Sequence, residues 1–160
     1  MGEEAVVRHA VRAVVLDPED RIALVRFEFP GDVTFWAAPG GGLAADESAE
    51  AALRRELAEE LGLADFECGP LVWTRSHTFP WRGATVEQRE RYYLVRVPAF
   101  EIRPSFDETQ LAAEGVYELR WWALEEIDRS REVFAPRRLG RYLRDLVEQG
   151  VPAEPIDVGV

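Results

Sequence analysis

Three glutamates near the end of one uninterrupted stretch, Glu56, Glu59 and Glu60, have the spacing that best suggests chemistry. In a helix, positions three and four apart share a face, so these carboxylates would project within a sector of roughly 100°. Repulsion between like charges and the negative end of the helix dipole both oppose this arrangement, so helix stability does not explain it. Clustered carboxylate oxygens are ligands that Mg²⁺ prefers, and we therefore predict a Mg²⁺ site, with Mn²⁺ as an alternative ion.

A run of three glycines, Gly40, Gly41 and Gly42, precedes these glutamates. The run follows Pro39 and predicts a loop, because regular elements rarely continue through such a sequence. Successive glycines let backbone amides approach a phosphate group closely. The loop and the acidic helix together predict a site for a phosphate-containing small molecule, with the three glycines among its binding residues.

The glutamates require a helix, which we predict from Glu47 to Leu61. This stretch contains neither Gly nor Pro and is rich in Ala and Leu. Asp46 is placed to act as the N-cap, and Gly62 is placed to end the helix.

The rest of the chain alternates predicted strands with predicted helices, which indicates an α/β fold, an α/β/α sandwich with a mixed central β-sheet. With 160 residues, 47% of them hydrophobic, the chain fits one domain, which we place at residues 1–150, followed by a loose tail at 151–160. The predicted strands are Val6 to Leu16 and Ile22 to Phe27, joined by a hairpin, Phe66 to Thr78 and Arg89 to Val97, joined by a long connection, and Tyr117 to Leu124. The further predicted helices are Glu125 to Arg129 and Ala135 to Gln149.

Charge and hydropathy exclude several kinds of partner. The formal net charge of -11 gives polymeric nucleic acid and anionic membrane surfaces no electrostatic attraction to the chain, so we exclude both. No apolar run approaches the roughly 20 residues that span a bilayer, and the first residues lack the features of a signal peptide. These observations predict a cytoplasmic protein.

The stretch from Gly41 to Leu63 resembles the Nudix box, G-x5-E-x7-R-E-U-x-E-E-x-G-U, in which U is a bulky aliphatic residue. Every fixed position is matched, by Gly41, Glu47, Arg55, Glu56, Leu57, Glu59, Glu60, Gly62 and Leu63. The segment from Trp36 to Gly41 is similar to the one that usually precedes the box. The order of predicted elements is also similar to that of a whole Nudix domain, so the resemblance covers nearly all of the chain.

The resemblance implies roles for the residues of the box. Three glutamates would bind the divalent cation, namely Glu56, Glu59 and Glu60. Arg55 would orient a carboxylate, and Glu47 would brace the loop against the helix. One of the glutamates, with Glu59 as the candidate, would accept the proton of the attacking water. A cation bound to a diphosphate neutralises its charge and aligns a coordinated water for displacement at phosphorus.

Nudix proteins often recruit a further carboxylate from a loop before a late strand. Glu114 is similarly placed and is our candidate for an additional metal ligand. Glu108 and Glu118 compete with it, and each of the three also fits a solvated surface residue.

Candidates for the rest of the substrate site come from a period-two pattern formed by Trp73, Arg75, His77, Phe79 and Trp81. Alternation at period two would place these side chains on one side of an extended segment. We take Arg75, Trp81 and Arg89 as substrate-binding candidates, because indole rings stack on bases and guanidinium groups pair with phosphate oxygens. The alternative is that the aromatic residues belong to the core and that the arginines balance surface charge.

The resemblance implies a hydrolase of phosphoric anhydride bonds with a small nucleotide as substrate. The short chain is more similar to MutT-like nucleoside triphosphate pyrophosphatases, acting on a nucleoside triphosphate or a modified nucleotide, than to the longer ADP-ribose hydrolases. An ADP-ribose or nucleotide-sugar pyrophosphatase and a non-catalytic nucleotide-binding module are the alternatives. A homodimer is a further expectation from the family. The sequence leaves open the substrate, the number of metal ions and the general base.

Overall fold

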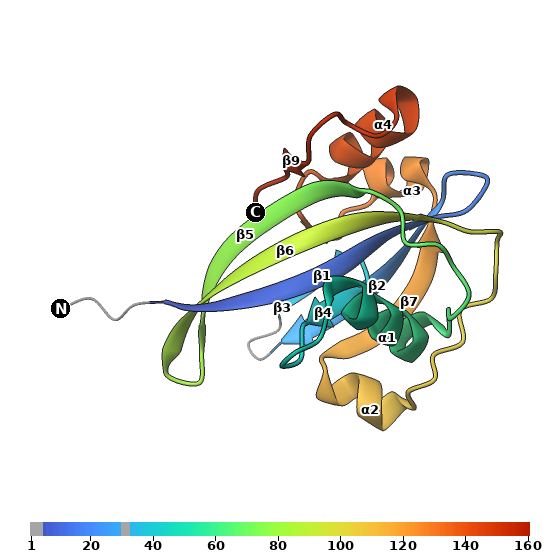
Figure 1. The fold of residues 1–160 in the computed structure, drawn as a ribbon. Coiled ribbons are helices and arrows are strands. Elements are labelled where there is room, and N and C mark those ends of the chain that lie inside the picture. Colours follow the sequence, from blue (N-terminus) through green and yellow to red (C-terminus); the bar gives the residue numbers. More distant parts are fainter. Residues whose placement is uncertain (1–4, 30–32) are drawn as a thin grey trace.

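The computed structural model describes residues 5–29 and 33–160 and shows one large sheet with helices on both faces (Figure 1). Neighbouring strands follow the order β8-β3-β2-β1-β6-β5-β9, while β4 pairs with β1 and β7 pairs with β2. The strands are β1 (Val6–Leu16), β2 (Ile22–Phe29), β3 (Val33–Ala37), β4 (Gly40–Gly42), β5 (Leu71–Trp81), β6 (Ala84–Arg96), β7 (Val116–Trp122), β8 (Phe134–Ala135) and β9 (Ile156–Asp157). The helices are α1 (Ala49–Leu61), α2 (Glu108–Ala113), α3 (Leu124–Arg129) and α4 (Leu139–Gln149).

Strand β1 organises the sheet. It lies parallel to β6 along its whole length and pairs with β2 in an antiparallel hairpin, with Leu16 opposite Ile22. Nearer its start, β1 has the short strand β4 as its other neighbour, with Gly42 opposite Ala10. The glycine run is therefore held directly against the central strand of the fold.

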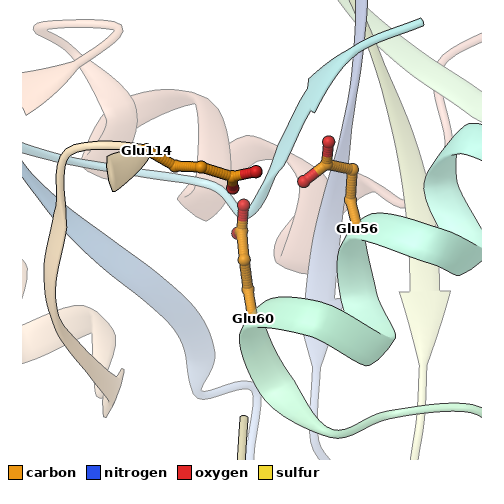
Figure 2. A group of neighbouring side chains, drawn as sticks. All are labelled: Glu56, Glu60 and Glu114. Carbon is orange, nitrogen blue, oxygen red and sulfur yellow. The ribbon is translucent and has the colours of Figure 1, made fainter. Parts of the chain in front are cut away.

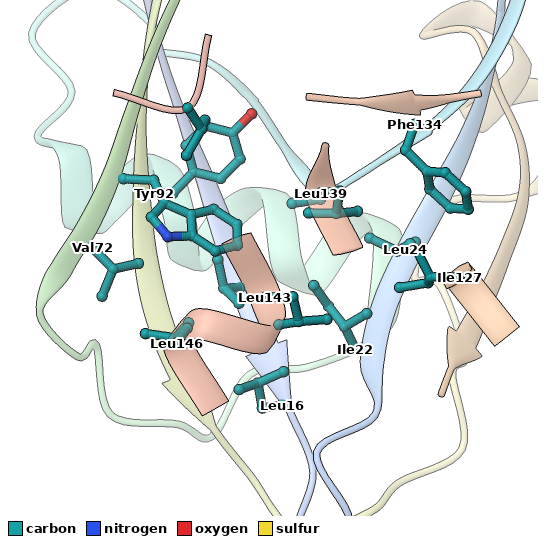
Figure 3. Packing of buried hydrophobic residues seen from close by; sticks show 14 of the residues in the cluster. Leu16, Ile22, Leu24, Val72, Tyr92, Ile127, Phe134, Leu139, Leu143 and Leu146 are labelled. Atoms are coloured by element: carbon teal, nitrogen blue, oxygen red, sulfur yellow. The ribbon is translucent and has the colours of Figure 1, made fainter. Parts of the chain in front are cut away.

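Alternate residues of β1 point to opposite faces of the sheet, so both faces carry apolar residues and both are covered by helices. Val11, Ala13 and Val15 pack in the cluster that contains the leucines of α1. Val14 and Leu16 pack in the cluster that contains the leucines of α4 (Figure 3). The sheet combines parallel and antiparallel pairs. The predicted α/β/α sandwich with a mixed central sheet is therefore confirmed.

The glycine run is a strand and not the predicted loop. Gly40 faces β1 so closely that a Cβ atom there would lie 2.0 Å from the carbonyl oxygen of Val11. Gly40 also has a φ of 145°, which side chains rarely allow. The absence of a side chain at Gly40 thus lets the backbones of β4 and β1 lie close enough to pair.

The predicted long connection after Thr78 is wrong. Strands β5 and β6 continue to Trp81 and Ala84, which pair with each other. Arg82 and Gly83 join them with φ values of 50° and 77°. Positive φ at both residues is typical of the two-residue turns that match the twist of a hairpin.

Helix α1 begins later than predicted, and Ser48 rather than Asp46 is its N-cap. The Ser48 hydroxyl accepts a hydrogen bond from the backbone of Ala51 at 3.1 Å. Asp46 has a φ of 62° and belongs to the preceding turn. The predicted C-terminus is confirmed, because Gly62 adopts the left-handed conformation with a φ of 71°.

The other helices differ from the prediction at their starts. Helix α4 begins at Leu139 and not at Ala135, because Ala135 pairs with β3 as part of β8. Helix α2 is absent from the prediction, although it has a capping box in which the side chains of Asp107 and Gln110 bond to each other's backbone amides at 2.8 and 2.9 Å. Within the described ranges, none of the helices is long and apolar enough to cross a membrane.

The C-terminal tail is not loose. Strand β9 pairs with β5 beside Trp73, and the Val158 amide donates to the carbonyl of Thr74 at 2.9 Å. Val158 is buried in the same cluster as the leucines of α4. The end of the chain therefore contributes to the core, while the domain boundary at residue 150 stays a prediction.

A buried carboxylate, Glu90 on β6, is held by several donors. Arg75 Nη1 donates to Glu90 Oε1 at 2.7 Å and Arg12 Nε donates to Oε2. Gln88 Nε2 and the Tyr92 hydroxyl donate to the same carboxylate at 3.2 and 3.4 Å. Burial alone would raise the pKa of Glu90, but Arg12 and Arg75 outweigh it and lower the pKa to about 2.

This network predicts a specific dependence of stability on pH. Between pH 4.5 and 2 the unfolded chain binds the Glu90 proton more tightly than the folded one, so the contribution is present above pH 4.5 and is lost as the pH falls towards 2. A change in pKa from 4.5 to about 2 corresponds to about 3 kcal/mol. We expect Glu90→Gln to lower the free energy of unfolding at pH 7 and to flatten its loss in acid, as measured by urea unfolding from pH 7 to 2.5. An acid limb identical to that of the wild type would contradict this prediction.

Candidate metal and catalytic site

Helix α1 brings two carboxylates into the interior. Its leucines are fully buried against the sheet, and the neighbouring Glu56 and Glu60 are only 5% and 1% exposed. A buried carboxylate is unfavourable unless protonation, hydrogen bonds or opposite charges compensate it. The groups that compensate the buried charges of Glu56 and Glu60 therefore indicate what this site can bind.

A third carboxylate reaches the pair from another part of the chain. Glu114 ends α2 just before β7 and points toward Glu56 and Glu60 (Figure 2). One oxygen atom from each of the three lies within 4.8 Å of the others. Glu56 Oε2 is buried without a hydrogen-bond partner among the described residues. Converging oxygen donors and an unsatisfied buried oxygen fit a hard divalent cation such as Mg²⁺.

Mutual repulsion shows in the pKa values of these carboxyl groups. Burial, and then the nearby charge of Glu56, hold the pKa of Glu60 well above its usual value of 4.5. The same two causes raise the pKa of Glu114 and that of Glu59. A bound cation would relieve this repulsion, because it favours the ionised form of each carboxylate.

Glu59 and the two competitors of Glu114 are placed differently. Glu59 Oε2 lies 3.5 Å from Arg55 Nη1, and Glu59 is not one of the three glutamates whose oxygens converge. Its role as a metal ligand stays a prediction. Glu118 forms an ion pair with Arg26 at 3.2 Å, and Glu108 is exposed in the first turn of α2. The structure thus brings only Glu114 of these three candidates to the buried pair.

The salt bridge between Arg55 and Glu47 joins α1 to the segment that connects it with β4. Arg55 Nε and Nη2 donate to the two oxygens of Glu47, each at 2.9 Å. Glu47 also accepts from the Ala44 amide at 2.9 Å, and Arg55 donates to the carbonyl of Gly42 at 3.2 Å and to Glu56 at 3.0 Å. The hydrogen bonds from Arg55 and Ala44 lower the pKa of Glu47 to about 2. This geometry supports the bracing and orienting roles that the sequence predicts.

The glycine run packs against the acidic residues. The Gly40 amide donates to Glu60 Oε2 at 3.2 Å, so the protein itself uses this donor. A Cβ at Gly41 would lie 2.5 Å from Glu56 Oε1, and a Cβ at Gly42 would lie 2.6 Å from Arg8 Nη2. Close packing of side chains is thus a second reason for glycine here. The predicted phosphate contacts of the three glycines stay a prediction.

The substrate-binding candidates fall into two places. Trp81 and Arg89 line one groove of about 650 Å³, whose walls also include Leu43 and Ala44, directly after the glycine run. Arg75 does not line this groove, because it is buried beside Glu90.

Three charged residues near the site are missing from the sequence prediction. Arg8 lies against Gly42 and helps to lower the pKa of Glu114, although burial leaves that pKa raised overall. Arg12 and Glu90 form the buried ion pair described above. Arg12 interrupts an apolar strand sequence, and a single charge in such a run is the signal that could have identified it.

The Gly41 contact predicts an effect on metal binding. In Gly41→Ala the new methyl group would displace the Glu56 carboxylate, because it would lie 2.5 Å from Oε1, so we expect weaker Mn²⁺ binding in a titration of the folded protein. Gly140→Ala is a matched control, because its methyl group would lie 3.0 Å from a carboxylate oxygen of Asp128, outside the cluster. Equal Mn²⁺ affinities for Gly41→Ala and the wild type would show that the contact does not position Glu56.

Comparison with known proteins agrees with this geometry. Residues 6–143 match the family profile of the NUDIX domain. An RNA pyrophosphohydrolase of Caulobacter vibrioides is 28% identical over 148 residues, covering 84% of this chain and 81% of that protein. An 8-oxo-dGTP diphosphatase of Proteus vulgaris is 34% identical over 79 residues, covering 49% of this chain and 70% of that protein. The crystal structure of a MutT protein from Methanosarcina mazei has the same fold, with a TM-score of 0.66 and 18% identity over 92% of this chain and 98% of that chain. The chain therefore belongs to the Nudix family of hydrolases.

Proposed function

We propose that this Nudix hydrolase cleaves a phosphoric anhydride bond of a nucleoside triphosphate or a modified nucleotide, with Mg²⁺ as its cation and Mn²⁺ as a substitute. The observation that carries the proposal is the convergence of Glu56, Glu60 and Glu114, two of them buried, on one point. An enzyme with a net charge of -11 would otherwise repel a polyphosphate. Carboxylates that share a cation with the substrate remove this conflict.

The side chains around the three converging glutamates would have different roles in the reaction. A bound divalent cation supplies charge neutralisation at the diphosphate and a lowered pKa for a coordinated water. Glu59 is the proposed general base, because it lies beside the converging carboxylates on α1 without being one of the three whose oxygens converge. Arg55 would hold Glu56 and Glu59 in place, at 3.0 and 3.5 Å, and Glu47 would hold Arg55.

The groove beside the glycine run is the proposed place for the remainder of the substrate. Its volume of about 650 Å³ is in the range of small-ligand pockets. Trp81 is 46% exposed and offers its indole ring for stacking on a base. Arg89 lines the same groove and would pair with a phosphate group.

Two other substrates are alternatives to a nucleoside triphosphate or a modified nucleotide. One is RNA, favoured by the Caulobacter relative, which is named as an RNA pyrophosphohydrolase. The overall negative charge of the chain argues against a long RNA, since few phosphates would be neutralised. The other is ADP-ribose or a nucleotide sugar.

The cytoplasmic location and the homodimer are predictions that accompany this proposal.

A substrate screen with the purified protein and Mg²⁺ or Mn²⁺ tests the proposal. The panel would contain nucleoside triphosphates, 8-oxo-dGTP, ADP-ribose, nucleotide sugars and a 5′-triphosphorylated oligoribonucleotide, with products separated by chromatography. We expect release of pyrophosphate and a nucleoside monophosphate from one class of triphosphate. Turnover confined to ADP-ribose or to the oligoribonucleotide would replace the proposed substrate by that alternative.

Loss of a converging carboxylate should strongly reduce turnover without unfolding the protein. We expect Glu60→Gln to reduce kcat by a factor of about 100 or more, because the cation loses a ligand and its charge balance. The thermal midpoint without metal should not fall, because the substitution also removes the repulsion that raises the pKa of Glu60. Glu108→Gln, a surface glutamate of α2, is the control. A kcat for Glu60→Gln equal to that of the control would refute the metal assignment.

The groove assignment predicts an effect on substrate binding rather than on chemistry. We expect Trp81→Ala to raise KM by a factor of about 5 to 150, which corresponds to about 1–3 kcal/mol for a base stacked on an aromatic ring, with kcat nearly unchanged. Val133, which is 55% exposed and does not line the groove, provides a control substitution to Ala. Unchanged KM values in Trp81→Ala for every substrate of the screen would move the base to another surface.

A further inference from the structure

Arg12 links the buried carboxylate of Glu90 to the segment that carries the glycine run. Its Nε donates to Glu90, and its Nη1 donates to the carbonyl oxygen of Ala38 at 2.9 Å. Two residues further along, the Gly40 amide donates to Glu60 at 3.2 Å. A path of polar contacts therefore runs from β6, through β1 and the start of β4, to a carboxylate of the cluster.

The segment between Arg12 and Glu60 has little room to move independently. The Ala13 amide donates to the carbonyl of Pro39 at 3.0 Å, so successive residues of β1 hold successive residues of this segment. Gly40 lies opposite Arg12 in the pairing of β1 with β4. A displacement of the Arg12 side chain would thus be transmitted to the amide that orients Glu60.

The position of Arg12 itself depends on Glu90. The Arg12 side chain is 11% exposed and that of Glu90 is 0% exposed, so neither charge is well solvated. A buried guanidinium that loses its carboxylate reorients or draws in water, because an uncompensated buried charge is costly. Glu90 therefore holds the guanidinium in an orientation that also reaches the carbonyl oxygen of Ala38.

Arg75 offers a natural comparison on the same carboxylate. It is 8% exposed and donates to Glu90 Oε1 at 2.7 Å. Within the described ranges, none of its hydrogen bonds reaches the segment from Ala38 to Gly40. Arg75 thus shares the energetics of the buried network without sharing the path to Glu60.

We infer that Arg12 and Glu90 are positioning residues for Glu60, and through it for the cation, an inference that rests on the proposed metal site. Neither side chain touches the reacting atoms, but the charge of Arg12 also acts directly on Glu60 and lowers its pKa, an effect that by itself would oppose binding of a cation. Together with the backbone pairing of β1 and β4, they set where the Gly40 amide lies, and this amide helps to set the direction of the Glu60 carboxylate. Groups that orient metal ligands in this way typically change metal affinity by a factor of about 10–100.

The test is a Mn²⁺ titration of the full chain followed by electron paramagnetic resonance, with thermal unfolding recorded for each variant. We expect Arg12→Met and Glu90→Gln each to weaken Mn²⁺ binding by about tenfold. The double variant should bind no more weakly than either single variant, because the two residues act in series. Arg75→Met should lower the thermal midpoint as Glu90→Gln does, yet keep the Mn²⁺ affinity of the wild type.

The outcomes separate this inference from the proposed function. Wild-type Mn²⁺ affinity in Arg12→Met and Glu90→Gln would overturn the inference and leave the metal site standing. An equal loss of affinity in Arg75→Met would also overturn it, because general destabilisation would then explain the effect. Failure of the wild-type chain to bind Mn²⁺ would overturn the metal site and the inference together. If one single variant does not fold, the other carries the comparison with Arg75→Met.

Discussion

The repulsion among closely spaced carboxylates is the constraint on which the rest of this structure depends. Glu56 and Glu60 are buried beside Glu114, and the pKa of Glu60 is raised because the charges are both desolvated and adjacent. The fold supplies partial compensation with the Gly40 amide and with Arg55. The repulsion that these groups do not compensate would favour binding of a cation among the three carboxylates.

Much of this arrangement follows from local sequence. The helix and its C-terminal Gly62 could be predicted from composition and spacing, because periodicity and the C-cap act over a few residues, whereas the predicted start at Glu47 and N-cap at Asp46 were wrong. The box spacing likewise puts Arg55 within reach of Glu47, which the structure shows as a two-point salt bridge. Glu114 could be proposed from its place before a late strand, but its approach to α1 depends on the path of the chain through α2.

The remaining features depend on contacts between distant parts of the chain. Strand β4 forms because Gly40 lies against β1, and three glycines alone do not reveal this partner. The ion pair of Arg12 with Glu90 joins residues 78 positions apart, so no local pattern connects them. The turn at Arg82 was obscured because an arginine at positive φ is uncommon and Gly83 alone is a weak turn signal.

Strand β9 has a consequence for how the end of the chain can be altered. It covers part of β5, and Val158 fills a place in the core beneath it. A chain ending after Gly150 would leave that place empty and would bare the backbone donors and acceptors of β5 near Trp73. Unpaired strand edges pair readily with other strands, so such a shortened protein would be prone to self-association through β5. An affinity tag on the last residue would be attached to a packed segment rather than to a free tail.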